Sequence, residues 1–467
     1  MNTTAFWKKD WFLALVIAAF FAIANSSSWL QSIERAAYDI GLRASAGEPN
    51  KRVAVIAIDD QSLANIGRWP WPRNLHAQMV DLLNGAGAKT IGYTAFFFEP
   101  QEDPGLTALR TLSSYFDSQG LTSERHNKEG ESYVAPGKSV LNLRRTMRRI
   151  PVEHRSEFAA TIDQLQRPIV QIQTELKSAV SLLDADEALS QSMRKASNVL
   201  LPVFMHIGSQ LGKPDSELPV HITKHRLTNI HDNINAKQNN LLPINSVGIE
   251  LPIEKLATAS AGLGHLSAAQ DIDGGIRSEP LLVNYYGEYY PSLSLMLAAH
   301  SLNLNTKDIH VNLGENVKVG QLTIDTDNAL KMNTYFYGNI NGRSAFTTDS
   351  FYDVISGKIP ASKFKNKVVL IGATAAGLGT TQVTPINGYV AGSHAGSFCI
   401  EHTRRRFLHL AQLGTLRHNW CFYTHHPLFD GGLTSLKRSN RGGRFWRLTA
   451  TVFWYSLRAH DHKRHMD

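Results

Sequence analysis

The chain has 467 residues and a formal net charge of +8. All of this charge lies beyond residue 390, because residues 1–390 carry 36 basic and 36 acidic side chains and residues 391–467 carry 12 and 4. The basic overall charge therefore does not indicate nucleic-acid binding by the first 390 residues, which are neutral. Both cysteines, Cys399 and Cys421, also lie beyond residue 390, which excludes a disulfide and a thiolate metal site before it.

The amino terminus predicts a membrane segment. Lys8 and Lys9 precede a stretch without charged residues, Trp11 to Leu30, and about 20 such residues span a bilayer. The positive flank predicts that residues 1–10 are cytoplasmic, that 11–30 form a transmembrane helix or signal anchor, and that the following chain is exported. A cleavable signal peptide is the alternative, because Ala22-Ile23-Ala24 resembles a cleavage site.

A βαβ unit follows the amino-terminal segment. Val53 to Ile58 is a β-branched, apolar run typical of a strand buried on both faces of a parallel sheet. Asp59 and Asp60 come directly after it, at the end of the strand where open α/β sheets bind ligands. Trp69 and Trp71 lie in a stiff Trp-Pro-Trp-Pro turn before a predicted helix, Arg73 to about Asn84, and a second strand follows from Ala88 to Phe98.

A helical insertion is predicted at about 104–198. Apolar residues at Leu165, Ile169, Ile172 and Leu176 are spaced alternately by four and three, which predicts one long helix with a continuous apolar stripe. The stripe has two interpretations: it packs against the rest of the chain, or it forms the seam of a homodimer.

The second half of the chain returns to strands. Val199 to Met205, Leu263 to Ala268, Ile276 to Tyr286 and Lys367 to Ile371 are the expected strands, and a helix is expected after Pro291. The fold class predicted from these elements is α/β, with a mostly parallel central sheet flanked by helices.

Candidate ligand-binding residues follow the strand ends. They are Asp59, Asp60, Trp69, Trp71, Asp271, Asp273 and Thr374, the last within a glycine-rich loop. The four carboxylates would suit a divalent cation, but Asp-x-Asp-Gly-Gly is also a good tight-turn sequence. The loop lacks the Lys and Ser/Thr of a nucleotide-hydrolysing loop. We therefore predict no bound metal and no cofactor.

Four separated blocks resemble one family. They are IAIDDQSLANIGRWPWPR from Ile56, AGAKTIGYTAFFFEPQEDPGL from Ala86, GHLSAAQDIDGGIRSEPLL from Gly264 and KVVLIGATAAGLG from Lys367. Together they resemble the second type of CHASE domain, the cyclases/histidine kinases associated sensory extracellular domain. The resemblance extends from about Ile33 to Tyr389. It departs at Tyr93-Thr94, where many members carry an acidic residue.

The resemblance implies a role and a location. It implies that residues 31–390 form the extracytoplasmic sensor of a bacterial inner-membrane receptor, which responds to an unknown small molecule or physical stimulus, and that the serine/threonine kinase or cyclase effector of such receptors is missing. Kinase sequence motifs are absent, so no enzyme activity is predicted. The alternatives are a periplasmic enzyme that uses Asp59, Asp60 and Asp271, and a structural or assembly protein of the envelope.

The tail, residues 391–467, fits none of these patterns. It holds nine of the 19 histidines and lacks sustained periodicity. A frameshift or truncation product is one interpretation, and a zinc site at Cys399, His402, Cys421 and His425 is the other.

Overall fold

The computed structural model describes residues 28–44, 51–101, 103–130, 132–214, 217–268, 270–337, 346–378, 381–386 and 390–391. They belong to one structural unit, Met1–Gln412. Residues 1–27, which include most of the predicted transmembrane helix, lie outside these ranges, as does the tail from residue 392. Within the described ranges, no helix is both long enough and apolar enough to span a membrane.

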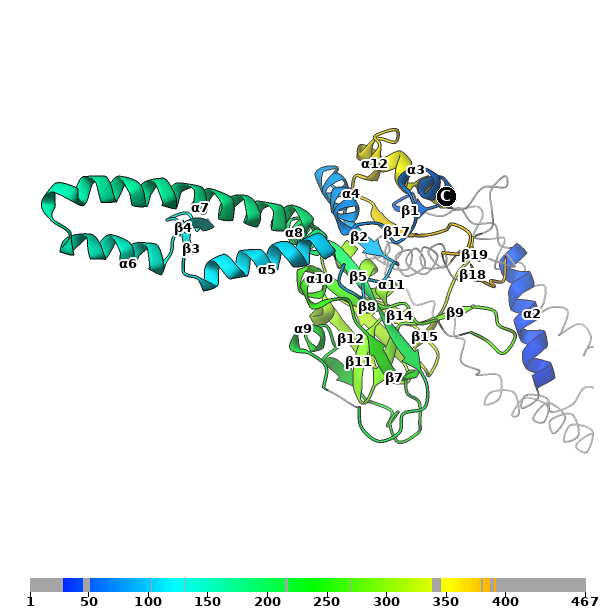
Figure 1. Cartoon of the computed structure of the whole chain (residues 1–467). Coiled ribbons are helices and arrows are strands. Elements are labelled where there is room, and N and C mark those ends of the chain that lie inside the picture. The colour runs from blue at the N-terminus through cyan, green and yellow to red at the C-terminus, as the bar shows by residue number, and fades with distance from the viewer. Residues whose placement is uncertain are drawn as a thin grey trace, which may run out of the picture. The chain divides into compact units, whose positions relative to one another are not determined.

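A nine-stranded sheet forms the centre of the fold (Figure 1), in the order β11-β10-β7-β5-β2-β17-β1-β16, with β8 also paired to β5. The strands are β1 (Val53–Ile58), β2 (Thr90–Tyr93), β5 (Val199–Ile207), β7 (Asn245–Glu250), β8 (Gly262–His265), β10 (Leu282–Tyr285), β11 (Glu288–Pro291), β16 (Thr347–Ser350) and β17 (Val368–Ala373).

The sheet is mixed, which corrects the predicted mostly parallel sheet. Strands β16, β1, β17, β2, β5 and β8 pair in parallel, as do β7 and β10. β5 pairs antiparallel with β7, and β10 pairs antiparallel with β11. The run Ile276 to Tyr286, predicted as one strand, is divided into β9 (Ser278–Pro280) and β10, and β9 pairs with β15 (Lys331–Asn333) instead of joining the central sheet.

Strand β1 is buried on both faces, as its uniform apolar sequence predicts. Successive side chains of a strand point to opposite faces, so Ala54, Ile56 and Ile58 enter one core cluster and Val53 and Val55 enter the other. The first cluster lies beneath α4 (Arg73–Gly85), α8 (Ala185–Ala196) and α10 (Glu254–Ala259).

The second cluster is covered by α11 (Leu293–Ser301) and a four-stranded sheet. That sheet consists of β14 (Leu322–Asp325), β13 (Asn316–Val319), β12 (Ile309–Asn312) and β6 (Asn229–His231). Its alternating residues, such as Val317, Val319 and Ile324, pack inward. The remaining flanking elements are α2 (Ser28–Ala44), α3 (Asp60–Ile66), α9 (Val220–Thr223), α12 (Phe351–Ile355) and the short pair β18 (Thr381–Gln382) and β19 (Val390–Ala391).

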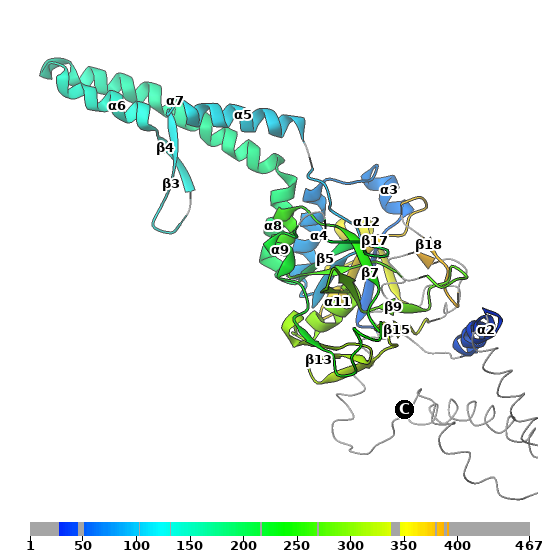
Figure 2. The same ribbon diagram turned by 90° about the horizontal axis from the view of Figure 1, so that it is seen from below.

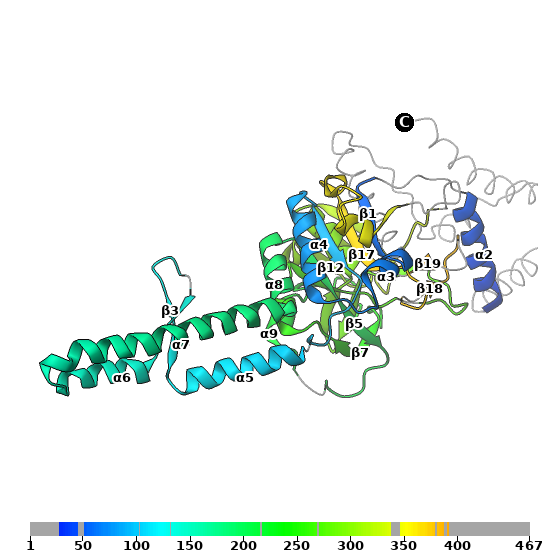
Figure 3. The same ribbon diagram turned by 45° about the horizontal axis from the view of Figure 1, so that its top comes forward.

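A helical arm, residues 104–183, connects β2 to β5 by way of α8. It consists of α5 (Pro104–Ser118), β3 (Thr122–His126), β4 (Ser132–Pro136), α6 (Lys138–Thr146) and α7 (Arg155–Leu183). Figures 1, 2 and 3 show α5 and α6 lying beside α7, with the far end of α7 away from the central sheet. The long helix predicted from the apolar stripe is therefore present, and α8 packs on α4 and α10.

Candidate functional site

Asp59 fixes the carboxyl end of β1. It caps the amino end of α3, because its Oδ1 accepts hydrogen bonds from the backbone N of Ser62 at 2.8 Å and from the Ser62 hydroxyl at 2.5 Å. The Ser350 hydroxyl, at the end of β16, donates to the same oxygen at 2.9 Å. The Asp59 carboxylate thus links the carboxyl ends of β1 and β16 to the amino end of α3.

Asp60 and Thr374 lie beside Asp59 at the same edge. The Thr374 backbone N donates to the Ile58 carbonyl at 3.0 Å, and the Ala376 backbone N donates to Asp60 Oδ1 at 3.3 Å. Asp60 is exposed and Thr374 is half-buried. The carboxyl ends of β1 and β17 therefore bring together three of the seven predicted residues, and two of them remain accessible.

Asp271 and Asp273 belong to a separate network around Arg277. The Arg277 guanidinium donates to Asp271 at 2.7 Å and to both Asp273 carboxylate oxygens at 2.9 Å. The Asp271 backbone N donates to the Gly275 carbonyl at 2.9 Å, as expected of a tight turn. Arg277 holds the pKa of Asp273 at about 2, mainly through these hydrogen bonds.

Arg277 also holds helix α2. Its Nε and Nη2 donate to the two carboxylate oxygens of Asp39, each at 2.9 Å, a bidentate arrangement that strengthens the pair. The Arg277 side chain is only 13% exposed, and the hydrogen bonds that it donates to Asp39, Asp273 and Asp271 raise its pKa. Sequence reasoning missed Arg277 and Asp39, because 238 positions separate them and no local pattern joins them.

Further contacts fix α2 against the same region. The Tyr38 hydroxyl donates to the Thr334 carbonyl at 3.1 Å, Arg43 Nε donates to the Pro385 carbonyl at 2.6 Å, and Leu42 is buried in the core. The Ile276 backbone N donates to the Val383 carbonyl at 2.8 Å. The loop 271–277 thus contacts both α2 and the segment 381–386.

Trp69 and Trp71 form part of an aromatic cluster. Trp71 is 2% exposed, its ring lies 4.9 Å from that of Phe351, and its Nε1 donates to the Gly67 carbonyl at 2.9 Å. Trp69 is half-buried, with its ring 5.3 Å from that of Trp71. In this conformation Trp71 packs in the core, so its side chain is not presented to a ligand.

The aromatic cluster encloses His76. Its ring lies 5.5 Å from Phe97, 5.6 Å from Tyr93 and 5.8 Å from Phe351, and the residue is 1% exposed. Burial, assisted by the charge of Arg73, lowers the pKa of His76 to about 3. His76 is therefore a neutral core residue at ordinary pH.

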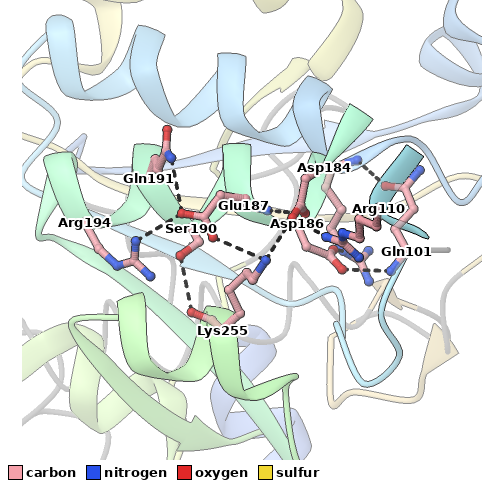
Figure 4. A network of polar contacts seen from close by, with 10 residues as sticks. Gln101, Arg110, Asp184, Asp186, Glu187, Ser190, Gln191, Arg194 and Lys255 are labelled. Atoms are coloured by element: carbon pink, nitrogen blue, oxygen red, sulfur yellow. Dashed lines mark hydrogen bonds and ion pairs between the residues drawn. The ribbon is translucent and has the colours of Figure 1, made fainter. Parts of the chain in front are cut away.

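A network of charged residues fixes the base of the arm (Figure 4). Arg73 Nε lies 2.9 Å from Asp186 Oδ1, with both side chains largely buried, and the Arg73 guanidinium lies over the Phe97 ring at 4.6 Å. Asp184 pairs with Arg110 of α5 at 2.5 Å and with Lys255 of α10 at 3.1 Å. These ion pairs connect α5, α8 and α10, so the arm is joined to the sheet domain by defined contacts.

The carboxylates do not form a cation site. Asp59 is engaged by serine hydroxyls, whereas Asp271 and Asp273 are engaged by Arg277. Within the described ranges, no group of three or more His, Cys, Asp or Glu side chains could hold a metal ion. A shallow hollow lies elsewhere, lined by Gln78, Asp81, Leu82, Gly85, Ala86, Ile355, Ala361 and Ser362.

The fold and these contacts define a mixed α/β domain with an inserted helical arm. Its amino-terminal helix, α2, is held by the ion pairs of Arg277. The family model of the CHASE2 domain matches residues 13–413. The chain belongs to the CHASE2 domain family, as its four sequence blocks predict. CHASE2 domains are extracellular sensory domains, which implies a sensory input role. No curated protein and no solved structure matches the chain.

Proposed function

We propose that the chain is the extracytoplasmic sensor of a membrane-bound receptor in the bacterial inner membrane, and that α2 transmits the signal to the membrane. In this proposal Trp11 to Leu30 is the membrane anchor, and α2 begins within its last residues. The observation that carries the proposal is the network in which Arg277 holds Asp39 of α2.

The Arg277 network suits a signalling contact because it is strong and directional. Bidentate hydrogen bonds between ionised groups depend on distance and orientation, so a shift of the loop 271–277 would change the hold on α2. A ligand can shift such a contact only by binding one arrangement better than the other.

We propose that the stimulus acts at the carboxyl ends of β1 and β17. Asp60 and Thr374 are accessible there, and open α/β sheets bind ligands at the carboxyl ends of their strands. Val383 follows Thr374 by nine positions and accepts a hydrogen bond from Ile276. A change at the edge would thus reach the loop 271–277 through a short piece of chain.

Hydrogen exchange of the α2 amides tests the signalling contact. Arg277→Gln removes the charge-assisted pair with Asp39, so we expect the α2 amides to exchange at least about tenfold faster than in the unsubstituted chain. Arg226→Gln is the matched control, because the Arg226 side chain, 47% exposed, pairs with a carboxylate outside this network, that of Glu288 in β11. Equal protection of α2 in all three proteins would contradict the proposal.

Ligand binding and topology are tested separately. A thermal-shift screen against small molecules and ions should find a compound that raises the midpoint, because a ligand of the folded state stabilises it by mass action. Asp60→Ala should abolish that shift, whereas Glu254→Ala, whose side chain is 81% exposed elsewhere, should not. Reporter fusions after Ser45 should behave as extracytoplasmic, and cytoplasmic behaviour would refute the proposed orientation.

A further inference from the structure

Two histidines lie side by side on the outer face of the four-stranded sheet. His231 is in β6 and His310 is in the neighbouring strand β12, and their ring centroids are 6.1 Å apart with an angle of 12° between the ring planes. The two strands are parallel, and they pair His310 with Asn229 and Asn312 with His231. The histidines are therefore diagonal neighbours on one face of the sheet, and long side chains in such positions can reach each other.

The backbone fixes the position of this pair. Ile309 and Val311, on either side of His310, are buried in the second core cluster, and Ile230, which precedes His231, packs against the same cluster. Strand β12 is hydrogen-bonded to β6 on one side and to β13 on the other. Successive side chains of a strand point to opposite faces, so both imidazoles must point away from the core. The sheet thus presents them together on a rigid scaffold.

The fold does not use either ring. His231 is exposed and His310 is half-buried, and within the described ranges neither imidazole has a hydrogen bond or an ion pair. Other histidines are engaged: the rings of His206 and His221 lie 2.8 Å and 3.8 Å from glutamate carboxylates, and His76 is enclosed in the core. The ring nitrogens of the pair are therefore available to an external ligand.

We propose that His231 and His310 together bind a divalent transition-metal ion such as Cu²⁺, Ni²⁺ or Zn²⁺. Imidazole nitrogen is a favoured ligand of these ions, and the metal–nitrogen bond is about 2.0–2.1 Å long. Two imidazoles on one such ion have their centroids about 5–6 Å apart, so small side-chain rotations from the present 6.1 Å are sufficient. The site is separate from the strand-end edge and from the Arg277 network, and it does not depend on the proposed function.

The neighbours of the pair favour these ions over calcium and magnesium. The residues in register with the two histidines are Asn229, Asn312 and Lys318, and none of them is a carboxylate. Ca²⁺ and Mg²⁺ require several oxygen ligands, commonly carboxylates, whereas Cu²⁺ binds nitrogen ligands most strongly among the common divalent ions. In the part of the chain that the structure describes, no third His, Cys, Asp or Glu ligand joins the pair. Water and the asparagine amide oxygens would complete the coordination, so binding is reversible.

The two histidines should act as one site because they share one ion. Once one nitrogen has bound the ion, the second imidazole is held beside it, and such intramolecular binding raises affinity by about 10²–10⁴. A single exposed histidine, such as His126 on β3, lacks this advantage. Removal of either member of the pair should therefore abolish binding at both.

Chemical modification of the full chain with diethyl pyrocarbonate tests the site. The reagent attacks free imidazole, and mass spectrometry reports each histidine separately, so the nine histidines of the tail do not interfere. At a Ni²⁺ concentration about ten times the dissociation constant, about one site in eleven is free, and His231 and His310 should both react about tenfold more slowly. His126 is the internal control and should react at an unchanged rate. Unchanged rates at His231 and His310 would overturn the proposal.

Single substitutions distinguish one shared ion from two independent contacts. His231→Ala should remove the protection of His310, and His310→Ala that of His231, because the apparent affinity falls at least about a hundredfold. His126→Ala is the matched control and should leave both histidines protected. Mg²⁺ at the same concentration should protect neither, and circular dichroism should show all variants folded, since the substituted side chains lie on the outer face. Protection of His310 that persists in the His231→Ala variant, or equal protection by Mg²⁺, would contradict a shared transition-metal site.

Discussion

Acid should destabilise the protein through His76, and His76→Phe should remove that share of the pH dependence. The buried imidazole has a pKa of about 3, whereas an unfolded chain gives histidine a pKa of about 6.5. Between these two values the unfolded state binds the proton and the folded state does not. The contribution of His76 to the free energy of unfolding is therefore fully present above about pH 6.5. It is lost progressively as the pH decreases from about 6.5 to about 3.

The size of the effect follows from the two pKa values. Each pH unit below the unfolded pKa corresponds to about 1.4 kcal/mol, so His76 should lower the free energy of unfolding by about 2 kcal/mol between pH 7.5 and pH 5. His265, whose pKa burial also lowers to about 3, should contribute a similar amount. Phenylalanine suits position 76 because the surrounding side chains are aromatic and His76 Nδ1 lacks a hydrogen-bond partner in the described chain.

Urea unfolding at pH 7.5 and at pH 5 measures this effect in the unsubstituted chain and in the His76→Phe variant. The difference between the two pH values should be smaller by about 2 kcal/mol in the variant. His126→Phe, at an exposed position on β3, is the control and should behave as the unsubstituted chain does. An unchanged difference in the His76→Phe variant would refute the reasoning.

Four further substitutions test the packing around the strands and their ends. Trp71→Ala should lower the free energy of unfolding by about 3–5 kcal/mol, measured by urea unfolding, because it empties a buried site. Asp59→Ala should lower the thermal midpoint, because it removes a helix cap and the hydrogen bonds from the Ser62 and Ser350 hydroxyls; the free energy of unfolding should decrease by about 1–2 kcal/mol. Asp60→Ala should change the free energy of unfolding by less than about 0.5 kcal/mol. Gly264→Ala should reduce the yield of folded protein and cost at least about 2 kcal/mol, because the added Cβ would lie 2.5 Å from the Leu293 Cα. Wild-type stability in any of the three destabilising variants would contradict the packing described here.

The local sequence pattern was sufficient to predict the central elements of the fold. The apolar run Val53 to Ile58 predicted a fully buried strand, and the helix predicted from Arg73 begins at that residue. Both depend on side-chain periodicity and on proline, which act within a few residues. The edge that joins Asp59, Asp60 and Thr374 was also predictable, because parallel strands end at the same edge of the sheet.

Features that depend on distant pairing could not be predicted in this way. The direction of β7 against β5 is set by tertiary contacts, so the sequence did not indicate a mixed sheet. The pairing of Arg277 with Asp39 requires α2 to lie against the loop 271–277, which no spacing in the sequence indicates. A tryptophan in a proline-rich turn either lines a ligand pocket or packs in a corner of the core, and the sequence leaves both interpretations open. The contact of Trp71 with Phe351 and its 2% exposure show that Trp71 packs in the core.

The two ends of the arm meet where it joins the sheet domain. A Cβ added to Gly105 would lie 3.8 Å from Leu183, and Arg110 pairs with Asp184 immediately after α7. The chain thus leaves and returns at one place, between two strands that are already adjacent and parallel in the sheet. The arm is therefore a separable insertion. A short turn could replace it, or heptads could be added to it, without changing the register of β2 and β5. The length of the arm could therefore change while the sheet that carries it stays the same.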